Sequence, residues 1–145
     1  MFYGLYHQPI EENNRLEIPA NFRELLANRV VITQGFDRNI LALPVEAFGD
    51  LSRLVMALNI ADPLARGLMR MLLGKASYLD IDQSGAISLK GSLKEFAGLD
   101  SEVVLVGQGK YFELWSQAAW QQQEIDLQDA EANSQRFMSM NLSGL

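Results

Sequence analysis

Cysteine is absent from the chain of 145 residues, and histidine occurs once, as His7. The lack of cysteine excludes a disulfide framework, a thiolate zinc site and a cysteine nucleophile. A single histidine leaves little basis for histidine catalysis or a histidine-ligated metal. No apolar run approaches 18 residues, and no basic start precedes an apolar segment. We therefore expect neither a membrane span nor a signal peptide.

The charge balance is acidic, with a formal net charge of -6. This balance argues against a protein that holds nucleic acid through bulk charge, although it leaves a local basic face open. Hydrophobic residues make up 48% of the chain and charged residues 21%. Such a composition is enough to bury a core, and the length predicts one domain or two very small ones.

Apolar periodicity and turn residues predict a mixture of short strands and helices. Besides a first strand that contains His7, we expect strands at 16–19, 29–33, 39–44, 76–81, 86–90, 102–107 and 111–115. Short helices are expected at 20–27 and 91–99, longer ones at 44–58 and 62–74, and a long polar helix at 116–138. Asp62 is the expected N-cap of its helix, and residues 139–145 are expected to fray.

The stretch DIDQSGAISLKG, Asp80 to Gly91, resembles a calcium loop at its start. Acidic and hydroxyl side chains alternate up to Gly85, which suits a hard cation bound around a sharp turn. The twelfth position, where a bidentate glutamate belongs, is Gly91, and no predicted helix precedes Asp80. A calcium site would therefore be weak at best.

An internal repeat offers another interpretation of this stretch. The segment EENNRLEIPANFRELL, 11–26, aligns with DQSGAISLKGSLKEFA, 82–97, at a spacing of 71 residues. Leu16 matches Ile87, and Arg23 matches Lys94. The match continues downstream with a shift of one residue. Because the counterpart of Asp82–Gly85 is a turn between two strands, turn chemistry explains its Asp, Ser and Gly without an ion.

Four segments together resemble the MraZ family of bacterial transcriptional regulators. They are MFYGLY, EENNRLEIPANFRELL, RMLLGKASYLDID and EFAGLDSEVVLVGQGKYFELWSQAAW, and the resemblance extends to about residue 123. It implies an α+β fold of two tandem halves of the AbrB and SpoVT type, built of short strands and helices, with a long C-terminal helix. The local pattern does not distinguish a swapped hairpin from a simple one.

The resemblance also implies which residues contact DNA. Family members carry a turn of the form D-x-x-G-R in each half, and its acid and arginine belong to the DNA-contacting surface. The matching positions here are Glu11, Asn13, Asn14 and Arg15 in the first copy and Asp82 in the second. Asn14 stands in place of glycine, and asparagine tolerates positive φ.

The second copy departs from the pattern at Ala86, where the arginine is expected. Arginine reads guanine and neutralises phosphate, whereas alanine does neither. Arg15 itself has a second interpretation, as an exposed turn arginine paired with Glu11, Glu12 or Glu17. Arg66 and Arg70 share one helix face, which we interpret as a solvated or intersubunit face in preference to a DNA contact.

Our prediction is a cytoplasmic, nucleoid-associated regulator that binds double-stranded DNA as a ring-shaped homo-oligomer. The resemblance implies tandem promoter repeats of a cell division and cell wall gene cluster as its target, with no catalysis, cofactor, metal, membrane or small-molecule substrate. The alternative is a ring-forming interaction protein that has lost most DNA binding. We predict repeats at 1–58 and 76–123, a connecting helix at 59–75 and a polar C-terminal segment at 124–145.

Overall fold

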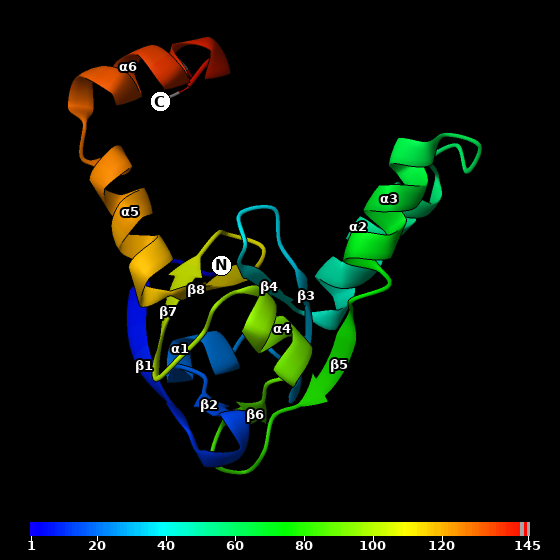
Figure 1. Ribbon diagram of the computed structural model, residues 1–145, viewed down its shortest axis with the longest axis vertical. Coiled ribbons are helices and arrows are strands. Elements are labelled where there is room, and N and C mark those ends of the chain that lie inside the picture. Colours follow the sequence, from blue (N-terminus) through cyan, green and yellow to red (C-terminus); the bar gives the residue numbers. More distant parts are fainter. Residues whose placement is uncertain (143, 145) are drawn as a thin grey trace.

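A computed structural model describes residues 1–142 and 144, and within them the chain forms a mixed α+β fold (Figure 1). Eight strands form one antiparallel sheet in the order β5-β3-β4-β8-β7-β1-β2-β6. The strands are β1 (Leu5–Glu11), β2 (Arg15–Glu17), β3 (Arg29–Gln34), β4 (Ile40–Leu43), β5 (Ser77–Asp80), β6 (Ala86–Ser88), β7 (Glu102–Gly107) and β8 (Phe112–Ser116). Because one short turn joins β5 to β6, the two ends of the order meet and the sheet is nearly closed.

Six α-helices accompany the sheet in the part of the chain that the structure describes. They are α1 (Ala20–Arg23), α2 (Val45–Met56), α3 (Pro63–Leu72), α4 (Gly91–Phe96), α5 (Gln117–Leu127) and α6 (Ala130–Phe137). Two 3-10 turns, η1 (Glu12–Asn14) and η2 (Met138–Met140), complete the elements. No helix among the described residues is long and apolar enough to cross a bilayer.

Strand pairing joins the two predicted repeats through equivalent residues. In the β2–β6 pair, Leu16 lies directly opposite Ile87, and these are the residues that the sequence alignment matches. In the β4–β8 pair, Ile40 lies opposite Leu114, and their respective repeat equivalents, Phe112 and Ala42, lie opposite each other. Strand registers that are exchanged in this way indicate a local twofold relation between residues 1–58 and 76–123.

The first strand of each predicted repeat pairs with the hairpin of the other. Strand β1 pairs with β7, and strand β5 pairs with β3. The sequence leaves a swapped and a simple hairpin equally open, and this pairing shows that the strands are exchanged. The two ranges therefore share one sheet, whereas their likeness to AbrB modules stays a prediction.

The main core lies inside the sheet and draws on both repeats. Phe22 of α1 is 1% exposed and packs with Phe2, Tyr6 and Phe112 at ring-centroid distances of 5.2, 5.1 and 4.8 Å. Burial of such side chains supplies the main favourable free energy of folding. Smaller apolar clusters lie under α2 and α3 and under the start of α5, where Trp120 is buried.

A buried carboxylate anchors the β3–β4 turn to β8. Glu113 accepts hydrogen bonds from Asn39 Nδ2 at 2.9 Å, Trp115 Nε1 at 3.1 Å and Gln108 Nε2 at 3.3 Å. Burial raises the pKa of Glu113, although the donors oppose that change. Because side chains alternate along β8, Glu113 lies on the face opposite to the core residues Phe112 and Leu114, and its oxygens are satisfied there by the three donors.

Most predicted elements are confirmed, including the Asp62 cap, whose carboxylate accepts from Leu64 N at 2.9 Å. The single helix at 116–138 is wrong, because α5 ends at Leu127 and α6 begins at Ala130. Asp129 accepts from Ala132 N at 3.0 Å and so caps a new helix. Of the tail expected to fray at 139–145, the first two residues belong to the 3-10 turn Met138–Met140, while residues 143 and 145 lie outside the described residues.

Replacing Phe22 with alanine is expected to lower the free energy of unfolding by about 3–5 kcal/mol, because a large buried ring is lost from a core shared by both repeats. Urea denaturation followed by circular dichroism measures this change. Leu25→Ala is the control, since Leu25 is 41% exposed, and its effect should stay near 0.5 kcal/mol. Equal losses in the two variants would contradict the proposed core.

Candidate nucleic-acid interface

Two turns lie next to each other at the β2–β6 end of the molecule. The first is η1, between β1 and β2, and the second runs from Asp82 to Gly85 before β6 (Figure 1). Ile18 N donates to Gly85 O, and Leu89 N donates to Asn14 O, both at 2.9 Å. Ile18 follows β2, and Leu89 follows β6, so each turn is hydrogen-bonded by a residue beyond the strand that comes after the other turn. These backbone hydrogen bonds set the position of the two turns relative to each other.

The first turn takes its shape from two asparagines. Asn13 has φ 63° and Asn14 has φ 59°, both in the left-handed region. Asparagine is among the few non-glycine residues that adopt this region readily. Gly85, the repeat equivalent of Asn14, has φ 87°. The prediction that Asn14 takes over a glycine conformation is therefore confirmed.

The second turn is organised by the side chain of Asp82. Its Oδ1 accepts from Ser84 N at 2.9 Å and from Ala86 N at 3.0 Å, and Gly85 N donates to Asp82 O at 2.9 Å. The prediction of a turn at 82–85 is confirmed by this geometry. Asp80, the other carboxylate of the calcium pattern, forms an ion pair with Arg29 at 3.2 Å. The carboxylates of Asp80 and Asp82 therefore both bind other groups of the protein.

Arg15 links the two turns. Its guanidinium donates to Glu11 Oε2 at 3.0 Å and to Asp82 Oδ2 at 3.2 Å, and it also hydrogen-bonds Ser84. The predicted pairing with Glu11 is confirmed, whereas the bond across to Asp82 was not foreseen. The side chain of Arg15 remains 35% exposed. The guanidinium is thus fixed in direction while part of it faces solvent.

These contacts shift the pKa values of both partners. Hydrogen bonds from the Ala86 N–H and the Ser84 hydroxyl, together with Arg15, hold the pKa of Asp82 well below its usual value. The hydrogen bond and charge of Asp82, with a smaller contribution from Glu11, raise the pKa of Arg15. Both groups are therefore charged at neutral pH.

Ala86 lies where the sequence pattern expects a second arginine, and its side chain is 1% exposed. Arg15 is paired with Ser88 across the β2–β6 ladder, yet its guanidinium reaches Ser84. Ser84 belongs to the turn that precedes β6, which is Ala86–Ser88. The Arg15 side chain therefore reaches from the β2–β6 ladder to the turn of the other repeat, where its partners are Asp82 and Ser84.

Two further cations reach the turns, and sequence reasoning missed this role for them. Arg23 of α1 donates to Ser84 O at 3.2 Å, and Lys94 of α4 donates to Asn14 Oδ1 at 2.9 Å. Each basic side chain contacts the turn of the opposite repeat. The match of Arg23 with Lys94 in the repeat alignment was the signal that could have found them.

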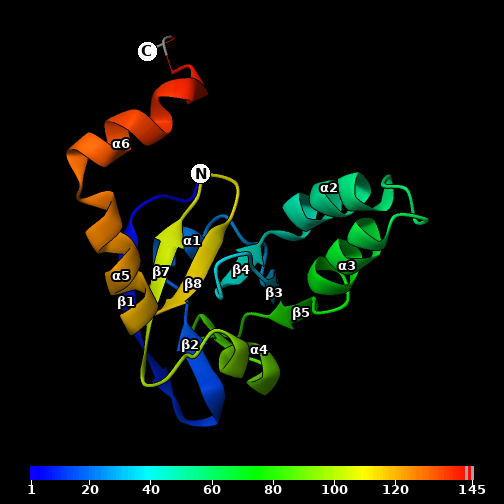
Figure 2. The same cartoon turned by 45° about the horizontal axis from the view of Figure 1, so that its top comes forward.

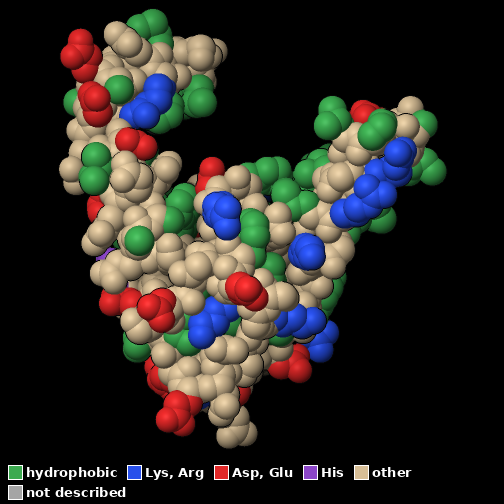
Figure 3. Space-filling view, in the orientation of Figure 1, with side chains coloured by type: hydrophobic (Ala, Val, Ile, Leu, Met, Phe, Trp, Pro, Cys, Tyr) green, Lys and Arg blue, Asp and Glu red, His purple; other side chains and the backbone are tan. Residues whose placement is uncertain are grey.

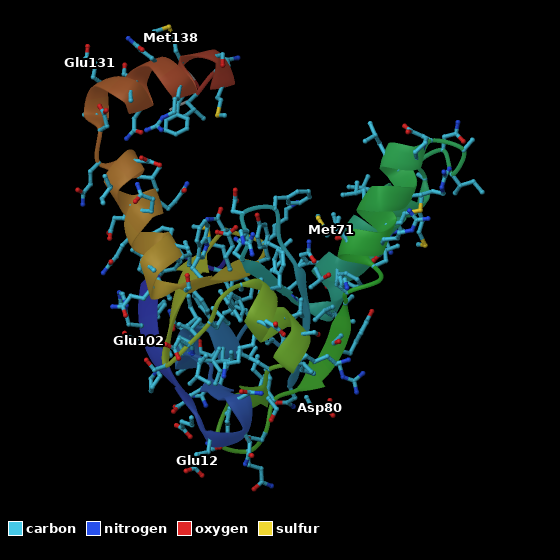
Figure 4. The ribbon with its side chains drawn as sticks, in the orientation of Figure 1. Glu12, Met71, Asp80, Glu102, Glu131 and Met138 are labelled. Atoms are coloured by element: carbon cyan, nitrogen blue, oxygen red, sulfur yellow. The ribbon has the colours of Figure 1, made fainter. Side chains whose placement is uncertain are left out.

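All five predicted site residues therefore gather at one end of the molecule. Glu11, Arg15 and Asp82 are joined directly, Asn14 contacts Lys94, and Asn13 is exposed on the same turn. Figure 4 shows Glu12, which precedes Asn13, at this end of the ribbon. Arginine and lysine donors lie between carboxylates at this end of the molecule. Such an arrangement suits a polyanion that is bound by individually placed donors and not by a high net positive charge.

Asp82→Asn is expected to lower stability at pH 7, because it removes the ion pair with Arg15 while keeping an oxygen for the turn. Since folding depresses the pKa of Asp82, its contribution is present above the unfolded pKa of about 4 and is lost as pH falls through the folded value. Urea denaturation at several pH values between 7 and 2 should show the difference from wild type shrinking on the acid side. Asp100→Asn, at an exposed aspartate, is the matched control, and a pH-independent difference for Asp82→Asn would contradict the linkage.

Comparison with known proteins identifies relatives of the chain. Residues 72–140 match the family described as "MraZ protein, putative antitoxin-like". The transcriptional regulator MraZ of Roseiflexus castenholzii is 39% identical over 92% of this chain and 92% of its own length. The namesakes of Herpetosiphon aurantiacus (39%; 83% of this chain, 85% of its own) and Thiobacillus denitrificans (35%; 99% and 98%) are similar. These relatives are named as regulators and not as enzymes, in agreement with the predicted lack of catalysis, and the chain belongs to the MraZ family.

Proposed function

We propose that the protein is a sequence-specific transcriptional regulator that binds double-stranded DNA through the two adjacent turns. The observation that carries the proposal is the position of Arg15, which projects between the turns and is held on both sides by carboxylates. Arginine is the side chain that most often reads guanine in the major groove, where two donors meet two acceptors. A guanidinium whose direction is already fixed loses less entropy when it binds.

Arg23 and Lys94 support the same surface as phosphate contacts. Both lie beside the turns, each half-buried and each donating one hydrogen bond to the turn it touches. Phosphate contacts set the register of a protein on DNA, whereas base contacts specify sequence. The chain's acidic total therefore does not oppose the proposal, because three cations gather where the backbone of DNA would pass.

The target and the assembly form part of the same proposal. The MraZ resemblance implies tandem short repeats upstream of a cell division and cell wall gene cluster, and a ring of identical subunits associated with the nucleoid. The exchanged strands support two AbrB-like halves, since each half needs the other to complete its sheet. Several turns on one ring would gain affinity for repeated sites through effective concentration.

One observation favours a second function, that of a ring-forming interaction protein with little DNA binding. A single arginine, Arg15, neutralises both Glu11 and Asp82, and Ala86 supplies no second guanidinium. Glu12 adds a further exposed carboxylate to the first turn. These acids would oppose the approach of phosphates.

Arg15→Ala is expected to weaken binding to tandem-repeat promoter DNA by roughly tenfold to a hundredfold, because one base contact is lost. Fluorescence anisotropy with repeat and scrambled duplexes, across a salt series, measures both specificity and the number of phosphates engaged. Arg53→Ala is the matched control, since Arg53 pairs with Asp50 on α2, away from the turns. If wild type binds repeat DNA no better than scrambled DNA, and log K barely changes with log salt, the regulator function is refuted.

Ala86→Arg is expected to strengthen DNA binding by roughly tenfold, because it gives the second turn a guanidinium beside Asp82. Ala86→Gln is the control, since it adds a long side chain without charge and should not strengthen binding. Thermal melting checks that both variants fold, because the alanine is buried. An unchanged affinity in a folded Ala86→Arg protein would remove the second turn from the interface.

A further inference from the structure

Arg15 lies at one end of the molecule, away from the helix pairs α2–α3 and α5–α6. It is the first residue of β2, and Figures 1 and 2 show the turn before it, between β1 and β2, at the lower end in both views. Its guanidinium holds the N–H donors in a planar fork. Nε and Nη2 form the side edge of this fork, and Nη1 and Nη2 form the end edge. Either edge offers a pair of parallel donors to a carboxylate or a base.

All but one of the Arg15 N–H groups have an acceptor among the described residues. Nε donates to Asp82, Nη1 donates one hydrogen to Glu11, and Nη2 donates to Asp82 and Ser84. Neither edge of the guanidinium is therefore free in this state. A base that takes two donors from Arg15 has to displace one of these acceptors.

Asp82 occupies the side edge and is anchored independently of Arg15. Its Oδ2 accepts from Nε and from Nη2 of Arg15, both at 3.2 Å. Its Oδ1 accepts from Ser84 Oγ at 2.8 Å and from the backbone N–H groups of Ser84 and Ala86 at 2.9 and 3.0 Å. Because the turn itself holds this carboxylate, Asp82 stays in place and keeps the side edge closed.

Glu11 covers part of the end edge and is anchored only by Arg15. Its Oε2 accepts from Nη1 at 3.0 Å, and its carboxylate makes no other hydrogen bond within the described part of the chain. The side chains of Glu11 and Asp82 are equally exposed, at 48%, so anchoring and not exposure distinguishes them. Release of Glu11 also returns rotamer freedom to a long side chain.

The end edge is the one that remains for a guanine. In the major groove, arginine donates two bonds to guanine O6 and N7. An exposed ion pair contributes little free energy, so guanine can displace Glu11 from Nη1 at small cost. The Ser84 hydroxyl, which accepts from Nη2, is a neutral group and holds the guanidinium less strongly than a carboxylate does.

We propose that the two acids act on Arg15 in opposite ways. Asp82 is a positioning residue that aims the guanidinium, and Glu11 is an autoinhibitory contact that a guanine displaces. The inference rests on the proposed DNA-binding function and describes how its main side chain is controlled. In the free protein, Glu11 covers the end edge of Arg15, and binding to guanine exchanges this carboxylate for the base.

Glu11→Gln and Asp82→Asn together test the proposal. Each removes one negative charge from an equally exposed partner of the same arginine, so charge alone predicts that both strengthen DNA binding. We expect Glu11→Gln to strengthen binding to tandem-repeat duplex about two- to fivefold beyond its control. Asp82→Asn is expected to weaken it about three- to tenfold, because the guanidinium loses its direction. Fluorescence anisotropy measures both.

Glu12→Gln is the matched control for Glu11→Gln. Glu12 is exposed on the same turn, is labelled at this end in Figure 4, and forms no ion pair among the described residues. Figure 3 shows acidic side chains at the surface of the lower end, so the loss of any one of them reduces repulsion of phosphates. Only the gain of Glu11→Gln beyond that of Glu12→Gln belongs to the contact with Arg15.

A duplex with 7-deazaguanine at the repeat guanines tests which DNA group displaces Glu11. This base lacks the N7 acceptor, while its pairing and the phosphates are unchanged. On this duplex the gain of Glu11→Gln is expected to fall to that of Glu12→Gln. If the full gain persists, phosphate and not guanine displaces Glu11, and the proposal is overturned.

Solvent exchange of the Arg15 Nε–H proton, measured by NMR, reports on the side edge without DNA. Exchange is expected to be slow in wild type and in Glu11→Gln, because Asp82 accepts from Nε, and faster in Asp82→Asn. Arg15→Lys identifies the signal by its loss. Thermal melting sets a temperature at which every variant is folded. Equal exchange in all three proteins would contradict the positioning role of Asp82.

Two further binding results would overturn the inference. One is a gain for Glu11→Gln on repeat DNA no larger than that of Glu12→Gln, and the other is an Asp82→Asn protein that binds repeat DNA more tightly than wild type does. If either occurs while wild type still prefers repeat to scrambled DNA, only this inference falls. If wild type shows no such preference, the proposed regulator function falls first.

Discussion

Antiparallel pairing between equivalent strands of the two repeats is the constraint on which the rest of the structure depends. Leu16 faces Ile87 in the β2–β6 pair, and Leu41 faces Glu113 in the β4–β8 pair. The exchange of β1 and β5 between the hairpins obeys the same twofold relation, since β1 pairs with β7 and β5 pairs with β3. The shared core around Phe22 and the adjacent turns depend on these pairings.

The two adjacent turns share a single arginine. The Arg15 side chain reaches Asp82 of the other repeat, and Ala86, beside that turn, is buried. Asp82 keeps its role in shaping its own turn through the amides of Ser84 and Ala86. One arginine thereby serves two acids, and the two turns become a single charged unit.

The turns and the helix pairs α2–α3 and α5–α6 lie at different ends of the molecule and have different surfaces (Figure 1). The turns are polar and are fixed by backbone hydrogen bonds between β2 and β6. Both helix pairs expose apolar side chains; α5–α6 is mainly acidic, whereas α2–α3 carries charges of both signs. The DNA binding proposed for the turns would therefore leave both helix pairs uncovered.

Local patterns in the sequence were enough to determine most strands and helices, the turn at 82–85, the positive φ of Asn14 and the cap at Asp62, because each depends on neighbouring residues. The repeat and the MraZ resemblance likewise came from the sequence. The tertiary structure alone decided the exchange of strands, the Arg15–Asp82 bond, and the contacts of Arg23 and Lys94 with the turns. Each joins groups 45 or more residues apart, and no local propensity specifies which distant strand a strand will pair with.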